Sequence, residues 1–207
     1  MSPGANGFEG AHSSCSTTTR RSRGFEAKKE AVAAVYGMAP DDRLLYPRVC
    51  GDMTWVAPTR YLAKQMKSVS AAAWRYHFNY VLEALAPIWP GTFHGDEVRF
   101  VFNRPGPVII SEEQSKSYLK NLGIKVMAGR YQASERDMEV ANTVHNLWVQ
   151  FAMTGDPNGP GLPEWPKYTE ETDTTLLISN EQIGSVQGLH REQLDFLEAD
   201  YIARRDK

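Results

Sequence analysis

The feature that most constrains the fold is a run of alternating aromatic and polar residues at positions 74–80, which reads WRYHFNY. Side chains that alternate with a period of two point to opposite faces of an extended chain, so residues 72–80 are predicted to form a β-strand. The chain then breaks at residues 87–91, and His94 follows on a short loop. We therefore expect His94 at the exposed carboxyl edge of a sheet, where sites of open α/β proteins lie.

Two blocks of residues give this histidine a more specific meaning. Residues 91–102 read GTFHGDEVRFVF, and residues 148–158 read WVQFAMTGDPN, followed by WPKY at 165–168. These blocks resemble the corresponding segments of the type-B carboxylesterases, the family that includes the cholinesterases. In that family the histidine at the position of His94 is the general base of a Ser-Glu-His triad. The resemblance runs over about residues 4–178 and is most specific at these blocks.

A candidate for the triad acid lies near the start of the chain. Residues 4–10 read GANGFEG, which by itself indicates a turn with one solvated acidic residue, Glu9. The segment also resembles the part of the carboxylesterase family that carries the triad acid. Glu9 comes before His94, and this order fits the hydrolase sequence of serine, then acid, then histidine. The resemblance therefore implies that Glu9 orients His94.

The nucleophile that such a triad needs is not found in the chain. Ester hydrolysis by this route requires a serine on a sharp strand-to-helix turn, usually within Gly-x-Ser-x-Gly, and backbone N–H groups that meet the oxyanion. The 207 residues contain no Gly-x-Ser-x-Gly. The resemblance thus implies the C-terminal part of an α/β-hydrolase, with a few sheet strands and their packing helices. We expect this part to be inactive alone and to need an N-terminal half of the same domain.

A second interpretation stays open beside the enzyme. The chain could be a non-catalytic relative that acts as an interaction module, as some cholinesterase-like adhesion proteins do. A module without chemistry has no physical need for Glu9 and His94 together, and both are present, so we favour the ester hydrolase. A third interpretation is a product that does not fold stably. Parallel sheets are normally covered on both faces, and a chain that lacks most of its central sheet should expose apolar surface.

Length and composition fit one partial domain over residues 1–207. Apolar residues make up 42% and charged residues 23% of the chain, as in ordinary globular proteins. The net charge of −2 indicates no nucleic-acid partner, and no apolar run is long enough to span a bilayer. No signal peptide opens the chain, although the parent protein could be secreted or periplasmic. The loop GPGLP at 159–163 looks most like the bacterial members of the family. The expected partner is a small-molecule ester.

The remaining predictions concern individual segments. Residues 11–24 are rich in Ser, Thr and Arg and are predicted to form a mobile loop. Cys15 and Cys50 show no metal spacing; two free thiols are favoured over a disulfide. No metal or organic cofactor is implied, because Asp156 and Asn158 have no further carboxylates at ligand spacing. Further elements are predicted from helix caps and periodicity: helices at 25–36, 55–69, 134–153 and 189–204, and a strand at 174–179.

Overall fold

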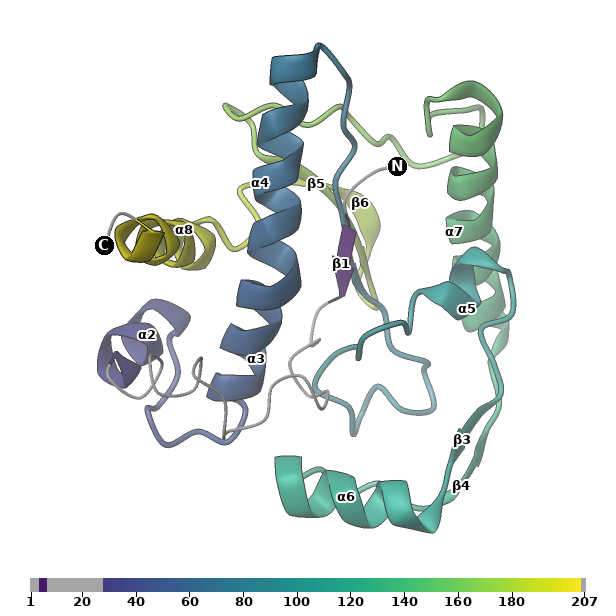
Figure 1. Cartoon of the computed structure of the whole chain (residues 1–207). Helices are drawn as coiled ribbons and strands as arrows, with labels where there is room; N and C mark the ends of the chain where they lie inside the picture. The colour runs from purple at the N-terminus through teal and green to yellow at the C-terminus, as the bar shows by residue number, and fades with distance from the viewer. Residues whose placement is uncertain (1–3, 7–27, 206–207) are drawn as a thin grey trace.

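The computed structural model describes residues 4–6 and 28–205, which form a mixed sheet with helices on both of its faces (Figure 1). The order of the four strands in this sheet is β1-β2-β5-β6. The first three strands of that order run parallel, and the last pair is antiparallel. The strands are β1 (Gly4–Asn6), β2 (Tyr76–Asn79), β5 (Thr174–Ser179) and β6 (Ile183–Gln187).

Helices cover the sheet from two sides. Figure 1 shows α7 on one side of the sheet and the long helical run of α3 and α4 on the other, with α2 and α8 further out. The helical segments are α2 (Lys29–Tyr36), α3 (Leu45–Gly51), η3 (Asp52–Val56, π-helical), α4 (Ala57–Gln65), η4 (Met66–Val69, 3-10), α5 (Val98–Val101), α6 (Glu112–Leu122), α7 (Glu135–Thr154) and α8 (Arg191–Arg205). A small ribbon of β3 (Val108–Ile110) and β4 (Gly129–Tyr131) leads into and out of α6.

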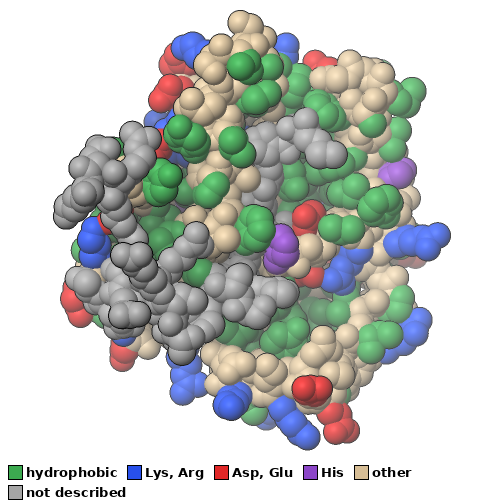
Figure 2. Space-filling model, in the orientation of Figure 1, with side chains coloured by type: hydrophobic (Ala, Val, Ile, Leu, Met, Phe, Trp, Pro, Cys, Tyr) green, Lys and Arg blue, Asp and Glu red, His purple; other side chains and the backbone are tan. Residues whose placement is uncertain are grey.

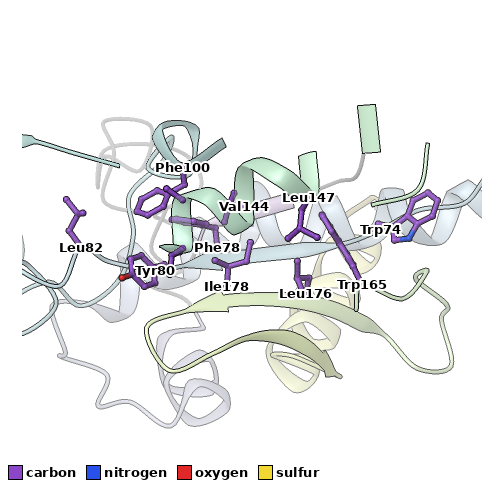
Figure 3. Packing of buried hydrophobic residues seen from close by; sticks show 12 residues of the cluster. Trp74, Phe78, Tyr80, Leu82, Phe100, Val144, Leu147, Trp165, Leu176 and Ile178 are labelled. Atoms are coloured by element: carbon purple, nitrogen blue, oxygen red, sulfur yellow. The ribbon is translucent and has the colours of Figure 1, made fainter. Parts of the chain in front are cut away.

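The main core lies between α7 and one face of the sheet. Phe78 of β2 and Ile178 of β5 are paired across the two strands, and both are completely buried. Val144 and Leu147 of α7 pack against them, as Figure 3 shows. The apolar stripe that the sequence predicts for this helix is therefore the stripe that covers the sheet.

The start and end of α7 follow local sequence signals. The Ser134 hydroxyl accepts a hydrogen bond from the backbone N–H of Asp137, and the Asp137 side chain accepts one from the N–H of Ser134. This reciprocal pair satisfies N–H groups that have no partner inside the helix. Gly155 ends the helix with a left-handed backbone conformation at φ 76°. The predicted helix at 134–153 is confirmed almost to the residue.

The polar side of the predicted strand is buried, which the alternation did not indicate. Arg75 and His77 are only 1% and 3% exposed, because helices also cover this face of β2. Burial lowers the pKa of His77 to about 3, so its imidazole is neutral. The regular strand is also shorter than predicted, covering Tyr76–Asn79 instead of residues 72–80.

A buried ionic cluster explains how Arg75 is tolerated inside the protein. Its guanidinium lies 3.1 Å from the carboxylate of Asp173, which is fully buried. Arg60 of α4 approaches the same carboxylate at 2.8 Å and also pairs with Asp195 of α8 at 2.6 Å. The cluster thus connects the residues that directly precede β2 and β5 to two helices, α4 and α8. It also makes Arg60 a buried residue of α4, whereas its apolar neighbours Tyr61 and Leu62 are exposed.

The structure corrects one further expectation. Cys50 is disulfide-bonded, so the expectation of a free thiol at this position is wrong. The only other cysteine of the chain, Cys15, lies outside the described residues, as do Glu9 and the segment 11–24.

Within residues 4–6 and 28–205, no helix is both long and apolar enough to cross a bilayer. In the same part of the chain, no cluster of three or more His, Cys, Asp or Glu residues could hold a metal ion.

Candidate active site

His94 lies on a tight turn between β2 and α5, as the sequence predicts. The loop that carries it folds back to the sheet, where the Thr92 hydroxyl donates a hydrogen bond of 2.9 Å to the carbonyl oxygen of Phe78. Phe78 lies near the carboxyl end of β2. This contact therefore fixes the loop at the carboxyl edge of the sheet, two residues before His94.

The turn is shaped by the residues after the histidine. The Asp96 carboxylate accepts a hydrogen bond of 2.8 Å from the backbone N–H of Phe93 and pairs with Arg99 at 2.6 Å. Gly95 has φ 85°, a left-handed conformation that glycine adopts without the clash that a Cβ atom causes. Burial raises the pKa of Asp96, while Arg99 and the Phe93 N–H oppose that rise. Together these contacts hold the backbone on both sides of His94.

The side chain of His94 is exposed, and one of its ring faces is covered. The indole of Trp55, from η3, stacks on the imidazole with 4.4 Å between ring centroids and 16° between planes. Such a stack restricts rotation of the imidazole. A histidine that is held in orientation and is exposed to solvent is able to exchange protons with a reacting group that approaches it.

The first strand brings a second chain segment to the same edge. β1 runs parallel to β2, and Asn6 is paired with Phe78. The carboxyl end of β1 therefore meets the sheet edge at the strand position to which Thr92 is bonded. Glu9 follows three residues later in the sequence and lies outside the described residues. The pairing of Glu9 with His94 thus stays a prediction.

Two other histidines, His77 and His145, make packing contacts inside the protein. His145 of α7 makes a contact of 2.8 Å between Nδ1 and the carbonyl oxygen of Val101. His77 meets the ring of His190 edge to face at 5.4 Å, beside a polar cavity of about 110 Å³. Neither is brought to the turn of His94.

Sequence reasoning missed a buried acid in η3, the segment that also carries Trp55. Asp52 of η3 lies one helical turn before Trp55 and accepts a hydrogen bond of 2.7 Å from the Tyr36 hydroxyl. Burial raises the pKa of Asp52 to about 6, against the lowering effects of the Tyr36 hydrogen bond and of Arg48. Near His94, the ion pair of Asp96 and Arg99 joins side chains that are only three positions apart in the sequence, so it leaves a local signal. The contacts of Asp52 and Trp55 are long-range and leave no such signal.

Comparison with known proteins gives the site its context. A model described as the carboxylesterase family matches residues 41–197. Carboxylesterase 5A of Canis lupus familiaris is 30% identical over 149 residues, which are 70% of this chain and 23% of that protein. Carboxylesterase 3B of Mus musculus is 28% identical over 131 residues, which are 62% of this chain and 20% of that protein. These relatives are mammalian and do not support the expected bacterial affinity.

The fold has a counterpart among solved structures. A structure named PNB esterase superposes with a TM-score of 0.56 at 20% sequence identity, covering 92% of this chain and 37% of that one. This likeness confirms the predicted fold class, a part of an α/β-hydrolase. The aligned segments span about a fifth to a quarter of the length of the curated relatives.

Proposed function

The chain belongs to the carboxylesterase family, and from this membership we propose that it supplies the histidine and the acid of a Ser-Glu-His triad that hydrolyses carboxylic esters. The observation that carries the proposal is the position of His94. It is an exposed imidazole on a turn that hydrogen bonds and a glycine hold at the carboxyl edge of the sheet. Sites of α/β proteins lie at this edge.

In the proposed reaction His94 acts first as base and then as acid. It takes the proton of a serine hydroxyl as the serine oxygen attacks the ester carbonyl carbon. It returns that proton to the alcohol oxygen when the tetrahedral intermediate collapses to an acyl-serine. A water molecule then attacks the acyl-serine by the same two proton transfers, releasing the carboxylic acid. Glu9 would accept a hydrogen bond from the other ring nitrogen and stabilise the imidazolium.

We propose further that the serine and the oxyanion donors come from polypeptide outside these 207 residues. Within the described residues, no strand pairs with the outer edge of β1. Several large apolar side chains also reach the surface, among them Tyr61, Phe102 and Met153, and Figure 2 shows hydrophobic side chains over much of one face. A segment that extends the sheet beyond β1 would be a suitable partner, since an edge strand presents backbone N–H and C=O groups to which another strand can pair. On this proposal the chain alone has no triad-dependent ester hydrolysis.

Hydrolysis of a short-chain nitrophenyl ester by the purified chain tests the proposal that the serine lies outside these 207 residues. The unmodified chain and the variants His94→Ala and His145→Ala should show the same slow background rate, because surface nucleophiles cleave such esters without a triad. A rate for the unmodified chain well above that of His94→Ala, with His145→Ala unaffected, would mean that a nucleophile is present in the chain.

A chimera tests the role of His94 directly. In it, this chain replaces the part of the PNB esterase on which it superposes, and the rest of that esterase is kept as the proposed source of the serine. His94→Ala in an active chimera should lower kcat by about 10⁴-fold or more, as loss of a triad histidine does. Glu9→Gln should lower it too, whereas His145→Ala should not. An active chimera that tolerates His94→Ala would refute the proposed triad. A folded chimera without any activity would favour the non-catalytic interaction module.

A further inference from the structure

A cavity beside the loop of His94 is lined by residues on both sides of that loop. It has a volume of about 420 Å³ and lies between residues 80–105 and the unit formed by β3 and α6. Pockets of about 300–1,000 Å³ accommodate small organic ligands. All residues that line the cavity are described, and His94 is not among them. The cavity can therefore be considered apart from the triad proposed above.

The inner wall of the cavity is aromatic and aliphatic. Trp89, Phe93 and Tyr118 form a cluster in which the ring centroids lie 5.0 to 5.6 Å apart. Leu85 and Ile110, which are both buried, extend this wall. Such a surface suits the apolar body of a ligand, an aryl or alkyl group, because burial removes both surfaces from water.

The charged groups of the cavity carry a positive excess. Asp96 and Arg99 neutralise each other through their ion pair of 2.6 Å, and Asp96 also accepts the N–H of Phe93. Arg104 lines the same cavity with an exposed guanidinium that forms no ion pair with any described residue. A carboxylate on the ligand would complement Arg104, whereas a ligand cation would have to compete with Arg99 for Asp96.

From this arrangement we propose that the cavity binds small amphipathic carboxylates, with the apolar body against the Trp89 cluster and the carboxylate at Arg104. The proposal does not rest on the triad, because it requires neither His94 nor a nucleophile. Phe93 joins the two sites, since it lines the cavity and precedes His94 in the chain.

The test uses the unmodified chain and two ligands that differ only in charge. 4-Phenylbutyrate and 4-phenylbutan-1-ol are titrated into ¹⁵N-labelled protein, and binding is followed by chemical-shift changes, including the indole N–H of Trp89. We expect shifts confined to residues that line the cavity. The carboxylate should bind about fivefold tighter than the alcohol or more, as one partly exposed ion pair provides.

Two arginine variants locate the charge effect. Arg104→Gln should remove the preference for the carboxylate and leave the affinity for the alcohol unchanged. Arg136→Gln is the matched control, because Arg136 lies in the first turn of α7 and does not line the cavity. Any of three results would overturn the proposal: no shifts at the cavity with either ligand, equal affinity for the two, or an equal effect of the two variants.

Discussion

Replacement of Asp173 by Asn removes the negative charge at the centre of the buried ionic cluster and changes little else. Asn has nearly the same size, so no cavity is created. Asp173 has φ 49°, and Asn is among the few residues that tolerate this left-handed conformation. The substitution therefore isolates the loss of charge from changes in packing or backbone strain.

The expected magnitude follows from the groups left behind. Arg75 is 1% exposed and would lose its partner at 3.1 Å, whereas Arg60 would keep its ion pair with Asp195. Breaking a buried pair by removing one partner costs about 3–5 kcal/mol, because the other charge stays uncompensated in the interior. We expect Asp173→Asn to lower the free energy of unfolding by this amount.

Urea denaturation followed by tryptophan fluorescence measures this change. Glu139→Gln is the matched control, since it removes a carboxylate that pairs with Arg136 at 3.3 Å on the surface. That variant should differ from the unmodified chain by less than about 1 kcal/mol. The double variant Arg75→Leu/Asp173→Asn should lose less stability than the sum of its single variants, because no lone charge remains. A loss below about 1 kcal/mol for Asp173→Asn would refute the assigned role of the cluster.

Two further predictions concern the surroundings of the candidate site. His94→Ala should lower the free energy of unfolding by less than about 2 kcal/mol, because the imidazole is exposed and a stack such as that on Trp55 contributes little; a larger loss in urea denaturation would place His94 in the core. Burial raises the pKa of Asp52 from 3.8 to about 6. The contribution of this carboxyl group to stability is therefore fully present below pH 3.8 and is lost as the pH rises through 6. Asp52→Asn should therefore reduce the loss of stability between pH 4 and pH 7 by about 2 kcal/mol relative to the unmodified chain, at about 1.4 kcal/mol per pKa unit; equal losses in the two proteins would contradict the assignment.

The sequence predicted those parts of the candidate site that depend on local contacts. The break before His94 and the glycine after it are sufficient to predict an exposed loop after a strand, and the turn is found there. The structure adds the stack on Trp55, which depends on two segments meeting across the sheet edge. The pairing of Glu9 with His94 stays a prediction in both descriptions.

By itself, the sequence determined the features that neighbouring residues decide. The capping box at Ser134 begins α7, Gly155 ends it, and the apolar period of the helix selects its buried face. The period of two likewise indicated a strand around Phe78. These signals are readable because hydrogen bonds and side-chain directions within one element depend on residues only a few positions apart.

Only the tertiary structure decided which polar residues are buried. Arg75 and His77 have the same alternation as surface residues of a half-exposed strand, yet both lie inside the protein. The reason is that helices distant in the sequence cover the second face of β2, and that Asp173 supplies the counter-charge for Arg75. Burial of a charge depends on a partner from elsewhere in the chain, and a local pattern contains no information about that partner.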